Sequence, residues 1–160
     1  MTMPSLQTIT DVEDRNGSLQ ETSLGEAFGL LQARWGGGAR DRETALRLAF
    51  LAWYARAAPT FLTGLPDAVD TPSIFSETYF ALAGESSSDA EVCYVIGLMA
   101  RMFPWVLEDE SRWEQEGWRL TAKARLLAPN GVELKWFEGR GAYGRYFAHI
   151  FGGSRLGLAD

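Results

Sequence analysis

The sequence predicts an all-α protein, and three observations support that prediction. Apolar residues recur at i, i+3, i+4 and i+7, which places them on one face of a helix. The clearest such set is Leu46, Ala49, Phe50 and Trp53. Residues that start and stop helices, chiefly Ser, Asp, Pro and Gly, separate these stretches. No segment shows the strict apolar–polar alternation of a set of strands. We therefore expect a compact stack of about six to seven helices with short connections.

We expect a flexible or weakly ordered arm over residues 1–20, followed by a single helical domain over residues 21–160. The arm is polar and contains Pro4 and an Asn-Gly pair, which favour loops. Within the arm, a short strand is expected at residues 8–12. At 160 residues the chain is long enough for one domain to bury a core.

Capping residues define the expected helices. In the pattern Ser-x-x-Glu the Ser side chain accepts an amide bond and the Glu reaches back, which predicts helix starts at Ser23, Ser88 and Ser111. Asp41 is expected to cap another helix, and Thr71 to cap one that begins with Pro72. The expected helices cover residues 24–35, 42–57, 72–83, 89–103, 112–128 and 142–151, and residues 132–138 form a short element of unassigned type.

Gly117 interrupts the apolar face of the expected helix 112–128, where glycine costs roughly 1 kcal/mol of helix propensity relative to alanine. We expect the compensation to be room for a neighbouring helix. Together with Gly97, Ala124 and Pro129, this glycine makes residues 92–129 resemble a tetratricopeptide helical hairpin. The interval between the two glycines is longer than in that family. The resemblance implies tetratricopeptide-like packing and a scaffold that binds a protein or peptide rather than a catalyst.

Composition and charge restrict the class of partner. The chain has 21 acidic and 15 basic residues, a net charge of −6. This balance disfavours general affinity for nucleic acid or anionic membrane and is compatible with a basic protein partner. Cys93 is the single cysteine, and the longest apolar stretch, residues 92–100, is too short to span a membrane. The first residues lack a basic start followed by an apolar run, so we expect a soluble, cytoplasmic protein.

The segment Gly139-x-Gly141-x-x-Gly144 has the glycine spacing of a nucleotide loop. Too few residues follow it for the rest of a dinucleotide fold, so we interpret the glycines as packing and turning residues. The surrounding segment is locally basic. An alternative is therefore RNA or peptide binding through Arg140, Tyr143 and Arg145.

Catalytic signals are sparse, and we expect no catalytic residue, no cofactor and no metal. Cys93 and His149 are formally a nucleophile and a base, but the thiol lies in an apolar stretch, where thiols are usually inert. An alternative function is a small enzyme with a carboxylate-lined pocket. Its candidate acids are Glu77, Glu91 and Glu114, with a divalent metal as a further option.

An acidic cluster rich in tryptophan is the preferred functional candidate. The predicted partner-binding residues are Trp105, Glu108, Asp109, Glu110, Trp113 and Glu116. The plainer interpretation is a solvated helix start, where negative charge is favoured by the helix dipole. Of the other tryptophans, Trp35, Trp53 and Trp118 suit the core, and Trp136 suits a looser segment. We therefore expect a non-enzymatic, acidic protein-binding module, and specifically a bacterial immunity protein that neutralises a basic toxin domain.

Overall fold

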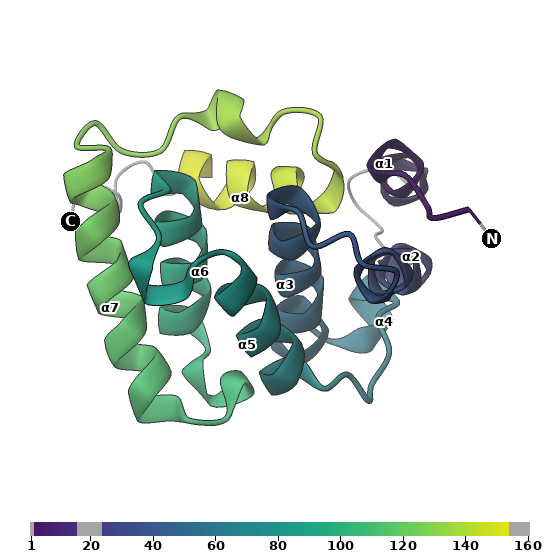
Figure 1. Cartoon of the computed structure of the whole chain (residues 1–160), viewed down its shortest axis with the longest axis horizontal. Helices are drawn as coiled ribbons and strands as arrows, with labels where there is room; N and C mark the ends of the chain where they lie inside the picture. The colour runs from purple at the N-terminus through teal and green to yellow at the C-terminus, as the bar shows by residue number, and fades with distance from the viewer. Residues whose placement is uncertain (1, 16–23, 154–160) are drawn as a thin grey trace. The chain divides into compact units, whose positions relative to one another are not determined.

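The computed structural model describes residues 2–15 and 24–153, and every ordered element within these ranges is a helix (Figure 1). The all-α prediction is confirmed. The chain divides into two compact units, Met1–Gly84 (unit 1) and Glu85–Asp160 (unit 2). The expectation of one domain over residues 21–160 stays a prediction. None of the described helices combines the length and the apolar composition that a bilayer crossing requires.

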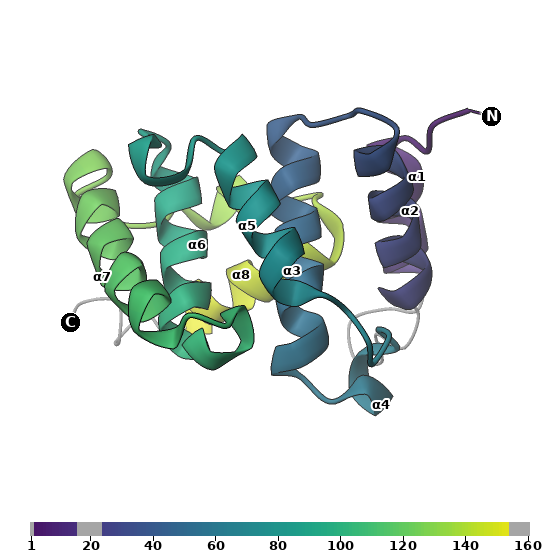
Figure 2. The same ribbon diagram turned by 60° about the horizontal axis from the view of Figure 1, so that its bottom comes forward.

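Unit 1 is built around α3, on which α2 and α5 pack, while α1 packs on α2 (Figure 2). Its elements are α1 (Leu6–Asp14), α2 (Leu24–Gly36), α3 (Arg42–Ala57), the short α4 (Thr60–Thr63) and α5 (Thr71–Ala81). The predicted apolar stripe of α3 is buried, and so are Leu48 and Leu51 on its other side. Residues 44–53 of α3 are buried on every side of the helix, which is typical of a central position in a core.

Residues 8–12 form part of α1, so the predicted strand is wrong. The Ser5 side chain accepts a hydrogen bond from the Thr8 amide and starts the helix. Ile9 and Val12 are both buried and lie three residues apart, a spacing that places two side chains on the same face of a helix but on opposite faces of a strand. Nearby, Glu13 forms a buried ion pair of 2.5 Å with Arg47 of α3. That pair between distant positions could not be read from the sequence.

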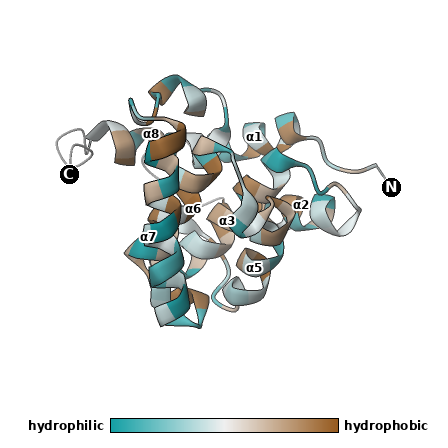
Figure 3. Cartoon of the chain, turned by 60° about the vertical axis from the view of Figure 1, so that its left-hand side comes forward, coloured by the Kyte–Doolittle hydropathy of each residue, from teal (hydrophilic) through white to brown (hydrophobic). Residues whose placement is uncertain are grey.

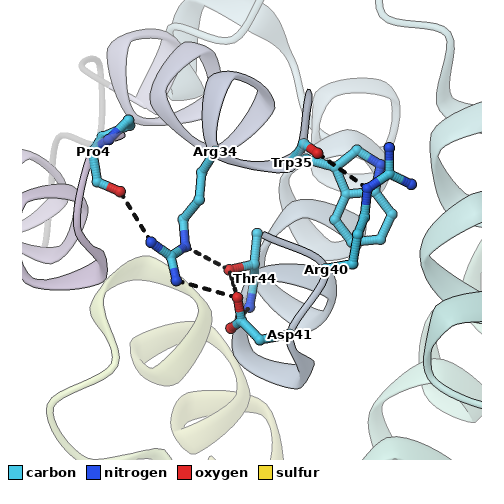
Figure 4. Close-up of polar contacts among 6 residues, drawn as sticks. All are labelled: Pro4, Arg34, Trp35, Arg40, Asp41 and Thr44. Carbon is cyan, nitrogen blue, oxygen red and sulfur yellow. Dashed lines mark hydrogen bonds and ion pairs between the residues drawn. The ribbon is translucent and has the colours of Figure 1, made fainter. Parts of the chain in front are cut away.

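Arg34 of α2 ties together three parts of unit 1 (Figure 4). Its guanidinium donates to the Pro4 carbonyl (3.1 Å), to the Thr44 hydroxyl (2.8 Å) and to the Asp41 carboxylate (3.2 Å). Asp41 also accepts from the Thr44 amide, which confirms it as the N-cap of α3. These contacts fix the segment before α1 and the turn between α2 and α3 to the same side chain.

Unit 2 is built on an antiparallel pair of helices followed by a third (Figure 1). The pair is α6 (Ala90–Met102) and α7 (Glu110–Leu127), joined through the 3-10 turn η2 (Pro104–Leu107). A second 3-10 turn, η3 (Leu134–Phe137), precedes α8 (Gly141–Gly153), and η1 (Gly84–Ser86) lies at the unit boundary. Gly97 and Gly117 lie against one another between α6 and α7, so the prediction of a close helix approach at Gly117 is confirmed.

Aspartates cap the helices at positions where the sequence analysis placed Ser or Thr. Asp89, Asp109 and Asp70 are the N-caps of α6, α7 and α5, and each accepts a bond from an amide three residues on. The Ser88 and Ser111 boxes and the Thr71 cap are therefore wrong, while Ser23 lies outside the described residues. A carboxylate is a strong N-cap that also complements the helix dipole.

Candidate interaction surface on the α6–α7 hairpin

The turn between α6 and α7 presents the predicted acidic cluster. Pro104 has no amide to continue α6, and η2 carries the chain round to α7. Glu108 then adopts a positive φ of 80°, a conformation that few residues other than glycine adopt. Asp109 follows and accepts from the Arg112 amide (3.4 Å) as the N-cap of α7. The sharp change in direction at Glu108 therefore places three consecutive acids at the end of the hairpin.

The structure brings four of the six predicted partner-binding residues to an exposed surface. Trp105 is 58% exposed, and Glu108, Asp109 and Glu110 are exposed beside it in the chain. We call these four residues the acidic end surface. The Trp105 ring also meets Phe103 edge-on, with 5.2 Å between the ring centroids. This contact holds one side of the indole while the rest stays accessible.

Trp113 and Glu116 do not join this surface. Trp113 is only 2% exposed, because it shares the buried face of α7 with Gly117 and Leu120. The interpretation of Trp113 as a partner contact is therefore wrong. Glu116 is half-buried, and both its oxygens accept from the Arg119 guanidinium, at 2.6 and 2.8 Å.

The prediction that Trp118 lies in the core is wrong, because this residue is 56% exposed. The guanidinium carbon of Arg101, near the end of α6, lies 4.5 Å from the centre of the Trp118 ring. This cation–π contact covers one face of the indole. Helical spacing indicates this exposure. Trp118 directly follows Gly117, which lies on the buried face, and consecutive residues of a helix point in different directions.

The acidic end surface retains a negative charge that the fold does not neutralise. Glu108, Glu110 and Glu114 form no ion pair with any residue that the structure describes. The nearby Arg112 guanidinium lies over the Trp113 ring, 4.6 Å from its centre. An opposite charge from outside the chain would thus meet several carboxylates and an exposed indole.

The acids of the enzyme alternative have separate environments. Glu91 is 7% exposed, and its Oε2 accepts from Arg140 (2.6 Å) and from the Tyr143 hydroxyl (2.7 Å). Glu77 accepts from the Trp35 indole nitrogen at 3.4 Å, and Glu114 is exposed on α7. Among the described residues no group of three or more His, Cys, Asp or Glu side chains could hold a metal ion.

The Cys93 thiol is held in its protonated form. Burial raises the pKa of Cys93, and its Sγ lies 3.8 Å from the Ser87 carbonyl oxygen that accepts from it. His149 of α8 is exposed. A thiol with a raised pKa and no access to solvent is a poor nucleophile, as the sequence analysis expected of this position.

Residues of the C-terminal glycine segment make contacts within the fold. A Cβ on Gly144 would overlap the Phe137 carbonyl oxygen, while Gly139 and Gly141 adopt positive φ. These features support the interpretation that the glycines serve packing and turning. Tyr143 is fully buried and bonded to Glu91, so it is not presented to an RNA or peptide ligand.

Comparison with known proteins adds no relative from which a role could be transferred. No protein-family model, no curated protein and no solved structure matches the chain. The resemblance of residues 92–129 to a tetratricopeptide hairpin therefore stays a prediction.

Proposed function

We propose that this chain is a non-enzymatic protein-binding module whose acidic end surface binds a basic protein. The observation that carries the proposal is the exposure of Trp105 beside three exposed carboxylates, of which Glu108 and Glu110 form no ion pair with the described part of the chain. An exposed tryptophan is a common anchor of protein interfaces, and cationic side chains bind both carboxylates and indole rings.

In its specific form, the proposal is that the partner is a basic toxin domain and that the chain acts as its bacterial immunity protein. The net charge of −6 supports this form, because opposite charge accelerates association. In this form of the proposal, the tetratricopeptide-like hairpin of residues 92–129 supplies the scaffold. A gene for a large secreted toxin beside the gene for this chain is the expected genomic arrangement.

The test captures partners from lysate of the source organism with the full chain as bait. One variant neutralises the surface with Glu108→Asn, Asp109→Asn and Glu110→Gln. Asparagine preserves the N-cap at 109, and at 108 it is a residue found at positive φ more often than most others. The matched control changes three exposed acids elsewhere in unit 2, Glu85→Gln, Glu133→Gln and Glu138→Gln, and so alters the net charge equally.

The proposal predicts one basic protein that the unchanged chain and the control both retain, and that the neutralised variant and Trp105→Ala lose. Raised salt should weaken its retention. Equal retention by all four baits would contradict the assignment of this surface, and so would recovery of no basic protein.

A further inference from the structure

Helix α7 leaves a stripe of its outer side exposed. Helical spacing aligns five positions opposite the buried face: Ser111, Gln115, Trp118, Ala122 and Leu126. All five are exposed, and Leu126 retains 82% of its surface and Trp118 56%. Figure 3 shows α7 as a mainly hydrophilic ribbon interrupted by hydrophobic positions. Two large apolar side chains on one outward stripe are costly to leave in water, which favours a partner for this face.

Charge is distributed unevenly along one edge of this stripe. Glu110 and Glu114 lie on that edge near the start of α7, and Arg125 lies on it near the end. Arg101 of α6 reaches the same edge, where its guanidinium stacks on Trp118. Burial, and then the positive charge of Arg125, lower the pKa of Arg101. One half of the edge is therefore acidic and the other half is basic.

We propose that this face of α7 binds α7 of a second copy of the chain, in antiparallel orientation about a two-fold axis near Trp118. Trp118 lies at the midpoint of the helix Glu110–Leu127, so a two-fold axis there brings the two exposed indoles together. The same rotation sets the acidic half of each helix against the basic half of its partner. Such an interface is isologous, because each copy contributes the same residues.

Helix dimensions allow the expected contacts. At 1.5 Å per residue, Arg125 lies about 10 Å beyond Trp118 along the axis, and Glu114 about 6 Å before it. In an antiparallel pair the two side chains are thus offset by roughly 4 Å, which an arginine side chain spans. In an antiparallel pair this edge meets the same edge of the second copy, whereas in a parallel pair it would meet the opposite edge and Glu114 would not face Arg125.

The helix dipole accounts for part of this pattern, since it favours acids in the first turn and bases in the last. It does not account for the exposed indole of Trp118 or for Leu126, which a second copy would cover. One helix pair buries an area typical of weak association, so we expect dimers that form only at raised concentration. This inference does not rest on the proposed function, because Glu110 is the one residue of the acidic end surface that also lies on the edge of the stripe and the tested contact is between Glu114 and Arg125.

Sedimentation equilibrium of the full chain over a rising concentration series tests the proposal. The expected average mass approaches twice the chain mass of 17.7 kDa. Leu126→Glu places a negative charge opposite the acidic start of the second α7 and should leave the chain monomeric. Phe80→Ser, which changes a residue of α5 that is 84% exposed, is the matched control and should dimerise like the unchanged chain. Circular dichroism checks that each variant stays helical.

Charge reversal tests the orientation. Glu114→Arg opposes two arginines across each edge contact, and Arg125→Glu opposes two glutamates, so each variant alone should dissociate. An equal mixture of the two variants restores opposite charges at both contacts and should dimerise again. A chain that is monomeric at every concentration would overturn the proposal. Dimers that persist with Leu126→Glu, or that the mixture fails to restore, would overturn it as well.

Discussion

Gly97 and Gly117 face each other across the α6–α7 hairpin. A Cβ on Gly97 would lie 3.1 Å from the Gly117 carbonyl oxygen, and a Cβ on Gly117 would lie 3.0 Å from that of Gly97. Neither distance leaves ordinary van der Waals space for a methyl group. The two backbones can therefore approach this closely only because both positions are glycine, and the turn that carries the acidic end surface depends on that approach.

Gly117→Ala should destabilise the fold even though alanine is the better helix former. The new methyl group would lie 2.7 Å from Cγ of Arg101 as well as against Gly97. Overpacking costs about 1–3 kcal/mol, more than the roughly 1 kcal/mol of helix propensity that alanine adds. Urea unfolding measures the difference. Gly29→Ala is the control, because nothing lies within 4 Å of its Cβ position, and it should stabilise by up to about 1 kcal/mol.

Glu91→Gln should lower the free energy of unfolding by about 3 kcal/mol, since it removes the charge that Arg140 and Tyr143 share in the interior. Tyr143→Phe removes one hydrogen bond and should cost about 1.5 kcal/mol. The double variant should lose less than the sum of the two, because both changes disrupt the same contact. Glu114→Gln, at an exposed acid, should stay within about 0.5 kcal/mol of the unchanged chain. Additive losses would show that the Glu91 contact is not formed.

The stability difference between the unchanged chain and Asp41→Asn should depend on pH. Burial alone would raise the pKa of Asp41, but hydrogen bonds from Thr44 and the charge of Arg34 outweigh it and lower the pKa. A lowered pKa stabilises the fold above the pKa of the unfolded chain, about 3.9, and this stabilisation is lost as the pH falls through the folded value. Asparagine preserves the cap without the charge. Urea unfolding should show Asp41→Asn less stable at neutral pH, with the difference disappearing in acid.

Cys93 should resist thiol reagents in the folded protein at neutral pH, because burial raises its pKa and blocks access. The measurement is the rate of reaction with a disulfide reagent. Addition of denaturant should release one fast-reacting thiol per chain, the expected count for a single cysteine. Rapid reaction of the native chain would contradict the packing described for α6.

The helices could be predicted from the sequence more completely than the residues of the surface. Periodic apolar residues and Asp41 predicted α3 correctly, because both signals are local. The first helix was missed, since only Ile9 and Val12 mark its buried side and the Glu13–Arg47 pair joins residues far apart in the chain. Long-range partners of this kind leave no local pattern in one sequence.

Tryptophan exposure was the weakest part of the site prediction. Trp113 was predicted to be exposed and is buried, whereas Trp118 was predicted to be buried and is exposed. Nearness in sequence placed Trp113 with the acidic residues, but the direction in which a side chain leaves α7 decides its exposure. The consecutive acids 108–110 were predicted as exposed surface, and they are. The role of Glu91 could not be foreseen, since the Ser88 pattern offered a capping role and Arg140 lies far along the chain.

Hydrogen exchange on the full chain, alone and with its captured basic partner, tests the central claim most directly. The account predicts slower exchange on binding in residues 104–114, which contain η2 and the start of α7, with little change in α1 to α5. Protection confined to unit 1, or to α8, would contradict the assignment of the acidic end surface as the binding surface.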